Sequence, residues 1–536
     1  MSANQPRTAT LEAFRFKRGD WTAFMTLGTD NLAKIVVLPA ILIGTFHLAP
    51  EIVFGRIMPG LGLTLLIGLA IFAYLALRSA AAQGRSDVTA LPYGISTPAM
   101  FVYLFGIIGP VYFASGDPLL AYRIGLGAAF IGGLIELSGA LFGPLIQKLT
   151  PQVGILGTMA GVAIVWIAMI PTAIIFANPI IGLPALFVVL LGLVGQFQFP
   201  LRLPAGLVAI GLGVFLGFLT GDSTLQFDQV AFYVPLPVLG DLLVGLRLLM
   251  SRPDILAVVI PIAIYNFIET TGNVESAKAA GDSYRLPTCQ LVDGLGTCLG
   301  AAFGSPFPTS VYVGHPAYKQ MGGRSGYVLL TGLFLFAASL VGLFAFLQHL
   351  IPAAAISPLL VFVGIVMTDY AFQATPPGHG VAVAFALVPH IADLLKKQLD
   401  GTLLEVFQEG PASTALLSRL AENQGVYLQS YGVLSRGAII TGLLWGSILA
   451  FLIERDLRNA VFFSLLALIL SLVGLIHAEQ IGFSWSPATI GYLILTAILG
   501  LLYLARTIRV QTGQVLTSEG AAENESASGV EGKAAG

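Results

Sequence analysis

The chain has 536 residues, of which 56% are hydrophobic and only 10% are charged, with a formal net charge of -2. Soluble globular proteins carry about 25% charged residues, so this composition excludes a surface that faces water over most of the chain. It predicts an all-α polytopic membrane protein in the lipid bilayer, and the sequence has no basic stripe for nucleic acid.

The first half begins with a polar, basic tail, residues 1–21, that lacks the apolar core of a signal peptide. Runs of roughly 18–22 apolar residues, the length of a membrane-spanning helix, follow it through residue 220. We expect these runs to form the first structural repeat, 22–220. They lie near 23–46, 57–77, 92–114, 122–146, 153–176, 180–197 and 203–220.

A connecting loop, 221–253, separates this repeat from a second one at 254–510. Within the second repeat, residues 396–435 alternate charge and leucine, which predicts an amphipathic insertion on the membrane surface. The tail 511–536 has too few apolar residues to order itself. We expect about fourteen to sixteen spans in total. Those of the second half lie near 254–273, 288–303, 306–320, 327–348, 350–371, 379–395, 436–454, 458–477 and 486–506.

The placement of Lys and Arg predicts the orientation of the chain, because cytoplasmic loops carry an excess of both. The basic residues before the first span and after alternate spans fall on one side if the N-terminus is cytoplasmic. Only Lys396 and Lys397 fit this topology less easily. We therefore expect a multi-pass inner-membrane protein of a bacterial cell, with a cytoplasmic N-terminus.

Two segments differ from ordinary spans: "ALPYGISTPAMFVYLFGIIGP" (90–110) and "FGSPFPTSVYVGHPAYKQMGG" (303–323). Each begins with Pro, Gly, Ser and Thr, and each is the third element of its half. A broken helix exposes backbone groups that must face a polar ligand or cavity. Paired breaks of this kind predict an inverted-repeat transporter and its binding site, although two merely kinked spans are the alternative.

Glu269 and Asn273 give the sharpest polar signal inside an apolar run. A carboxylate at bilayer depth costs at least about 2.5–3.5 kcal/mol and usually faces a cavity where it has a function. Asn273 lies one helical turn later and offers both a donor and an acceptor. We expect both to bind substrate. The alternative is a hydrated Glu269 at the cytoplasmic interface.

Asp30 and Lys34 are four residues apart in the first span and are expected to pair, either as a structural ion pair or as a gate for the substrate. Glu136 has no opposite charge in its own helix. It either bonds to a neighbouring backbone or forms a second coupling site. Asp293 is expected to tie down the broken chain near the tenth span. All four are candidate coupling or supporting residues.

His315 follows Gly314 in the second broken segment and either binds substrate or is a structural histidine. The two cysteines, Cys289 and Cys298, are nine residues apart, which is no metal-ligand spacing. No phosphate-binding loop, zinc motif or nucleophile–base set is present. We therefore expect no enzyme, no cofactor and no metal, and no use of ATP by this chain.

Four stretches resemble the nucleobase:cation symporter-2 family of xanthine/uracil permeases, closest to its adenine/guanine/hypoxanthine permease-like branch. The resemblance covers roughly residues 20–395. The block from the eighth to the tenth span is the most specific part. The stretches are "IYNFIETTGNVESAKAAG", "VDGLGTCLGAAFGSPFPTSVYVGHPAYKQMGGRSG", "SPLLVFVGIVM" and "VVLPAIL".

The resemblance implies a 7+7 inverted-repeat fold, with a core domain of spans 1–4 and 8–11 and a gate domain of spans 5–7 and 12–14. Substrate would lie between the half-helices of spans 3 and 10, on a carboxylate of span 8. Glu269 matches that carboxylate, and Asn273 falls where the uracil permeases carry a histidine. The implied contacts from spans 3 and 10 are Thr97, Pro98, Ala99, Met100, Tyr312 and Val313.

One departure from the family concerns span 10, where Gly314 stands in place of the usual glutamate. Either His315 substitutes for that acid, or the substrate is not a standard nucleobase.

Together these features predict a secondary active transporter for a small planar heterocycle, with a proton or Na⁺ as the coupling ion. A second copy of the chain, giving a homodimer, is a candidate partner. One alternative is an organic or inorganic anion transporter of sulfate-permease-like architecture, against which Glu269 argues by repelling anions. Another is a non-transporting membrane sensor, with 396–435 as its output element.

Overall fold

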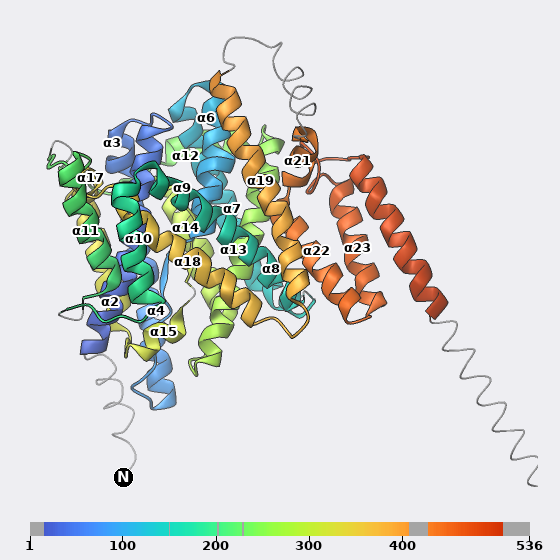
Figure 1. Cartoon of the computed structure of the whole chain (residues 1–536), viewed down its shortest axis with the longest axis horizontal. Coiled ribbons are helices and arrows are strands. Elements are labelled where there is room, and N and C mark those ends of the chain that lie inside the picture. The colour runs from blue at the N-terminus through green and yellow to red at the C-terminus, as the bar shows by residue number, and fades with distance from the viewer. Residues whose placement is uncertain are drawn as a thin grey trace, which may run out of the picture.

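The computed structural model describes residues 16–149, 151–200, 203–227, 230–312, 314–406 and 427–506. Within these ranges the regular structure is helical apart from one small sheet of two short strands, as Figure 1 shows. The elements of the first half are α2 (Arg18–Gly44), α3 (Pro50–Ile52), η1 (Val53–Ile57), α4 (Met58–Gln83), β1 (Tyr93–Ile95), α5 (Thr97–Tyr103), η2 (Leu104–Ile108), α6 (Gly109–Ser115), α7 (Pro118–Leu149), α8 (Gln152–Val162), η3 (Ala163–Met169), α9 (Ile170–Ala177), α10 (Pro179–Leu193) and α11 (Ala205–Thr220), where η marks a π-helical stretch.

The second half repeats the pattern of long helices interrupted by one strand. Its elements are α12 (Leu239–Leu249), α13 (Pro253–Ala279), α14 (Leu286–Ala302), β2 (Thr309–Val311), α15 (His315–Gln320), α16 (Gly326–Leu340), α17 (Leu343–Leu350), α18 (Ala353–Gln373), α19 (Gly380–Val406), α21 (Leu428–Ser435), α22 (Ala438–Ile453), α23 (Leu457–Leu472) and a last helix, Pro487–Arg506.

Every apolar run predicted from the sequence coincides with a helix or with a broken helix. Six of the described helices are long and apolar enough to cross a membrane, and eight are if each of two bent pairs counts as one span. The bends are 87° between α16 and α17 and 80° between α21 and α22. The chain is therefore a multi-pass membrane protein.

Three predicted boundaries differ or lie outside the described residues. Helix α2 begins at Arg18, inside the predicted tail 1–21. Helix α19 does not end near residue 395 but continues to Val406, so the first part of the predicted insertion 396–435 extends that helix. Its middle, 407–426, and the tail 511–536 lie outside the described residues.

The helices pack in two groups. In the first packing group, α4, α7, α13, α14 and α16 contact one another, and β1, β2 and α15 pack with them. In the second, α8, α9, α10, α11, α18, α19 and α22 form a continuous set of contacts. Helix α2 touches both α16 and α18 and so lies at the boundary between the groups. The last two helices of the described chain stand at one side of the molecule (Figure 1).

Glycine allows the closest helix approach inside the first packing group. A Cβ added to Gly294 of α14 would lie 2.7 Å from the carbonyl oxygen of Gly133 in α7. Within a membrane, where lipid is as apolar as the side chains, close packing of this kind drives helix association. The α7–α14 contact therefore depends on small residues on both sides.

The two predicted breaks are present, and they meet each other. Strands β1 and β2 pair antiparallel, with Gly94 opposite Ser310. Prolines 92, 98 and 308 flank the strands, and proline inside a helix removes a hydrogen bond and clashes with the preceding turn. The Ser96 amide donates to the carbonyl of Pro308 at 3.0 Å, so each broken segment satisfies backbone groups of the other.

Candidate functional site

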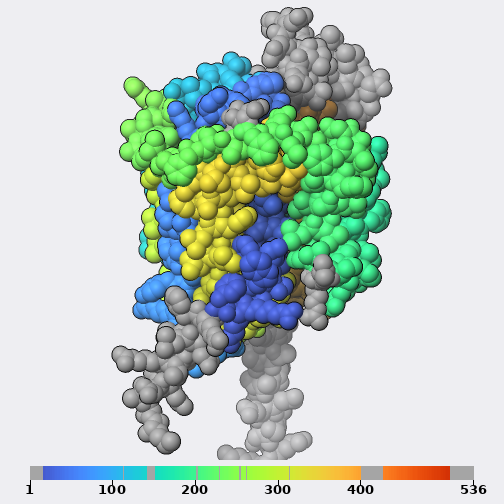
Figure 2. Space-filling model, turned by 90° about the vertical axis from the view of Figure 1, so that its left-hand side faces the viewer, coloured from blue at the N-terminus to red at the C-terminus, as the bar shows by residue number. Residues whose placement is uncertain are grey.

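A cavity of about 980 Å³ lies between the two packing groups. Helix α2, the β1–α5 junction, α13 and the β2–α15 segment form one wall, and α10, α11 and α18 form the other. Figure 2 views the side of the molecule where blue α2 runs between yellow and green helices. The polar residues that line it include Asp30, Lys34, Ser96, Thr97, Glu269 and Tyr312.

Glu269 occupies the middle of α13 and lines this cavity, although only 6% of its surface is exposed. The side chain is therefore inside the bundle, and it is not at a hydrated helix end. Its Oε2 lies 3.2 Å from the hydroxyl oxygen of Ser96, which follows β1 and precedes α5. The broken segment and the acid thus meet at one point of the cavity wall.

Behind Glu269 a chain of buried polar groups leads into the first packing group. The Ser96 hydroxyl lies 2.8 Å from Asn266 Oδ1, and Asn266 Nδ2 donates to Glu136 Oε1 at 2.7 Å. Thr297 donates to the other Glu136 oxygen at 3.0 Å. Glu136 therefore bonds neighbouring side chains rather than backbone, and it does not line the cavity.

The Ser96 hydroxyl has one hydrogen but two acceptors beside it. Asn266 already donates through Nδ2, so its Oδ1 faces Ser96 as an acceptor. If Ser96 donates to Asn266, its contact with Glu269 is a hydrogen bond only when Glu269 carries a proton and donates it. With Ser96 donating to Asn266, this contact distinguishes the two protonation states of Glu269, whereas a Ser96 that donates to Glu269 bonds the ionised carboxylate.

Asn273 does not reach the cavity, contrary to the prediction that it binds substrate. Its Nδ2 donates to the carbonyl of Val311 in β2 at 2.7 Å. Asp293 accepts a hydrogen bond from the Val311 amide at 3.3 Å and another from the Thr270 hydroxyl. Asn273 and Asp293 thus hold the same residue of β2, and Asp293 ties down the broken chain as expected.

Asp30 and Lys34 form an ion pair in the middle of α2, on the cavity wall. Lys34 Nζ lies 2.7 Å from Asp30 Oδ2 and 3.7 Å from the centre of the Tyr312 ring. The Tyr312 hydroxyl lies 3.0 Å from both Asn31 Oδ1 and the carbonyl of Ile95. Tyr312 therefore connects α2, β1 and β2 where they meet the cavity.

Of the other residues predicted to contact substrate, some line the cavity and others are buried in the protein interior. Thr97 and Pro98 line the cavity, whereas Ala99 and Met100 are fully buried and do not. Gly314 does not line it either, and its φ of 105° is a conformation that residues with a side chain rarely adopt. This backbone geometry is a physical reason for glycine at the position. Val313 lies outside the described residues.

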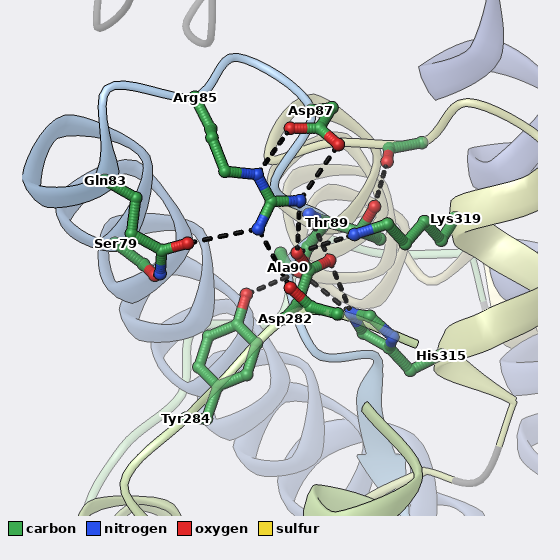
Figure 3. A network of polar contacts seen from close by, with 12 residues as sticks. Ser79, Gln83, Arg85, Asp87, Thr89, Ala90, Asp282, Tyr284, His315 and Lys319 are labelled. Atoms are coloured by element: carbon green, nitrogen blue, oxygen red, sulfur yellow. Dashed lines mark hydrogen bonds and ion pairs between the residues drawn. The ribbon is translucent and has the colours of Figure 1, made fainter. Parts of the chain in front are cut away.

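His315 is also directed away from the cavity, so it does not replace the missing glutamate there. Its Nε2 lies 3.0 Å from the carbonyl of Thr89 and 3.4 Å from Asp282 Oδ2 (Figure 3). Lys319 Nζ is 2.6 Å from the other Asp282 oxygen, and Arg85 reaches that oxygen at 3.4 Å. His315 thus belongs to a polar network that ties α15 to the loops after α4 and α13.

Asp282 is the centre of this network and is fully buried. Burial by itself raises the pKa of a carboxyl group, but hydrogen bonds from His315, Lys319 and the Thr89 amide outweigh it and hold the pKa of Asp282 below its ordinary value. The carboxylate therefore stays charged at neutral pH and fixes the end of the broken segment that carries α15.

Sequence reasoning missed Ser96 and the whole opposite wall. Ser96 lies inside the quoted segment "ALPYGISTPAM", next to Thr97, so its position was a usable signal. The wall formed by the second packing group consists mostly of apolar side chains, together with glutamine side chains from the connection between α10 and α11. An apolar residue inside an apolar run cannot be recognised from sequence as part of a binding site. Members of this wall are Gln196, Phe199, Leu359, Phe362 and Met367.

Among the described residues, no group of three or more His, Cys, Asp or Glu side chains could hold a metal ion.

Comparison with known proteins gives one curated relative and a shared fold. The chain is 26% identical over 276 residues to the guanine/hypoxanthine permease GhxP of Escherichia coli O157:H7, a match that covers 46% of this chain and 60% of the permease. This similarity confirms the resemblance to the nucleobase:cation symporter-2 family. No family model matches the sequence.

The transmembrane domain of the cyanobacterial bicarbonate transporter BicA superposes with a TM-score of 0.50 and 15% identity, over 72% of this chain and 97% of that domain. SLC26A9 gives a TM-score of 0.42 with 13% identity, over 70% of this chain and 69% of that protein. At 15% identity, the likeness to the bicarbonate transporter concerns the fold alone.

Proposed function

We propose that this chain is a secondary active transporter of a nucleobase-like heterocycle in the bacterial inner membrane, with its N-terminus in the cytoplasm. The observation that carries the proposal is Glu269, a buried acid on the wall of a cavity that a broken helix pair also lines. A carboxylate at this depth suits the ring N–H groups of a base. The similarity to a guanine/hypoxanthine permease supports the substrate class.

In this proposal the two packing groups are the core and gate domains of a 7+7 inverted repeat. The core would include α13 and the β1–β2 pair, and the gate would include α10, α11 and α18. Because the cavity lies between the groups, a movement of one against the other would open it to alternate sides of the membrane. A substrate bound to Glu269 and Ser96 would move together with the core domain.

We propose the proton as the coupling ion. When Ser96 donates its single hydrogen to Asn266, protonated Glu269 can donate to the Ser96 hydroxyl oxygen. The other oxygen of protonated Glu269 still accepts a hydrogen bond from a ring N–H, so the proton and the substrate are bound in the cavity together. The cavity thereby links the protonation of one acid to the occupancy of one site, which is the requirement for symport.

Anion transport is the second candidate function, and Lys34 is the observation that favours it. An ammonium group in the cavity could hold a carboxylate or oxyanion. Against it, Asp30 already pairs with Lys34 at 2.7 Å, and Glu269 adds a second acid to the same cavity.

A thermal-shift measurement separates the two candidates. We expect hypoxanthine or guanine at saturating concentration to raise the apparent melting temperature of the purified protein in detergent, because a ligand that binds only the folded state stabilises it. Bicarbonate, sulfate and small dicarboxylates at matched ionic strength should leave it unchanged. Stabilisation by these anions alone would favour the second candidate.

A further inference from the structure

Lys34 and Glu269 place an amine and a carboxyl group on the same wall of one cavity, from two different helices. Lys34 comes from α2 and Glu269 from α13. Both side chains are buried, with 2% and 6% of their surface exposed. The β1–α5 junction, with Ser96 and Thr97, lines the same wall, and Ser96 contacts Glu269. A ligand in this cavity can meet a hydrogen-bond donor from α2 and an acceptor from α13.

The ammonium group of Lys34 has hydrogen-bonding capacity left over. It carries three N–H donors, of which one points to Asp30 Oδ2 at 2.7 Å. The Tyr312 ring occupies a second side of the ammonium group, with the ring centre 3.7 Å from Nζ. Within the described residues, no other hydrogen-bond partner of Nζ is present, so one N–H remains for a ligand.

Asp30 and Tyr312 fix the position of this ammonium group. Asp30 supplies the partner that a buried ammonium group needs to compensate its charge, 2.7 Å from Lys34 Nζ. Tyr312 is itself anchored to Asn31 and Ile95 at 3.0 Å each. The donor is therefore preorganised, which strengthens its contribution to binding.

Resting on the proposed function, we infer that Lys34 is a specificity-determining residue that selects heterocycles with an oxo group. Its free N–H donates to a ring carbonyl or oxyanion, while Glu269 accepts from a ring N–H. A 6-oxopurine offers an adjacent carbonyl and N–H in one plane. A 6-aminopurine presents an N–H₂ donor at the same place, which would face the Lys34 donor without an acceptor.

The matched pair hypoxanthine and adenine tests this inference, because the two purines differ at the 6-position and in the ring nitrogen beside it. We expect unlabelled hypoxanthine to displace radiolabelled hypoxanthine from the purified protein at a concentration on the order of 10- to 100-fold lower than adenine does. This is the range for a hydrogen bond to a charged group in a site built to make it. In Lys34→Met the ratio should fall by about fivefold or more, chiefly through weaker hypoxanthine binding, while the ring N–H that hypoxanthine offers to Glu269 keeps it above one.

Lys278→Met is the matched control, because the Lys278 side chain is 63% exposed near the end of α13 and its ion-pair partner among the described residues is Glu275. This variant should keep the wild-type ratio. If Lys34→Met does not fold because Asp30 is left unpaired, the double variant Asp30→Asn/Lys34→Met removes both charges and carries the same expectation.

Each outcome decides the inference. Equal displacement by both purines in the wild-type protein, or an unchanged ratio in the Lys34 variants, would overturn it while leaving nucleobase transport intact. A wild-type protein that binds neither purine would instead overturn the proposed function on which the inference rests.

Discussion

Replacement of Glu269 by glutamine is expected to reduce coupled hypoxanthine uptake on the order of 100-fold while the protein stays folded. Glutamine keeps the size of the side chain and, like protonated Glu269, can place an N–H donor beside the Ser96 hydroxyl oxygen, which lies 3.2 Å from Glu269 Oε2. It cannot take up or release a proton, so the coupling of proton and substrate movement is lost. Coupling free energies of about 1–3 kcal/mol correspond to factors of about 5 to 150, which accounts for a decrease of this size. Uptake into proteoliposomes and the apparent melting temperature measure the two effects.

Glu275→Gln provides the matched control on the same helix. Glu275 lies less than two turns after Glu269, has 46% of its side chain exposed, and does not line the cavity. Its replacement should leave uptake within about twofold of the wild type, as expected for a surface substitution. Wild-type uptake by Glu269→Gln would contradict the assignment of Glu269 to the substrate.

Gly94→Ala should also lower uptake by at least about tenfold, although residue 94 carries no functional side chain. A Cβ at this position would collide with the Tyr312 hydroxyl and with Asn31 Oδ1. Tyr312 would have to move, and with it the ring that supports Lys34. Small displacements of positioning groups can cost about 100-fold in rate. The same uptake assay measures the loss, and the melting temperature reports any unfolding.

Gly211→Ala is the corresponding control, because a Cβ added to Gly211 of α11 meets nothing within 4 Å. We expect unchanged uptake and equal or slightly higher stability, since alanine is the better helix former. Equal uptake by the two alanine variants would show that the contact of β1 with Tyr312 does not shape the site.

The broken segments and the buried acid could be predicted from sequence because each violates a rule of membrane helices. Proline and glycine cannot continue the helix at 92–98 and 306–314, and a carboxylate such as Glu269 is costly in lipid. These signals are local. They predict where the chain departs from a plain span, and the strand pair and cavity are found at those places.

The role of Asn273 could not be predicted from its spacing. A residue four positions after Glu269 shares a helix face with it, but it also lies one turn, about 6 Å, further along the axis. At that position along its axis, α13 packs against β2 and does not border the cavity. Asn273 therefore donates a hydrogen bond to the carbonyl of Val311. The spacing of residues along one helix does not determine which residues of a neighbouring element they contact.

The sequence left two alternatives open for His315 and gave no indication of the apolar wall, for different reasons. His315 follows Gly314 directly, but the left-handed conformation of that glycine turns the chain, and the ring meets Thr89 and Asp282. The opposite wall depends on which of many apolar helices faces the cavity, and residues such as Phe362 resemble their neighbours in sequence. Tertiary packing determines which of the apolar helices faces the cavity.

Uptake of radiolabelled hypoxanthine into proteoliposomes of the purified protein, with and without an imposed proton gradient, tests the central claim most directly. We expect accumulation when the outside is more acidic, inhibition by excess unlabelled guanine, and no effect of bicarbonate or sulfate. Uptake of those anions without any uptake of a purine would contradict a carrier that holds a heterocycle on Glu269.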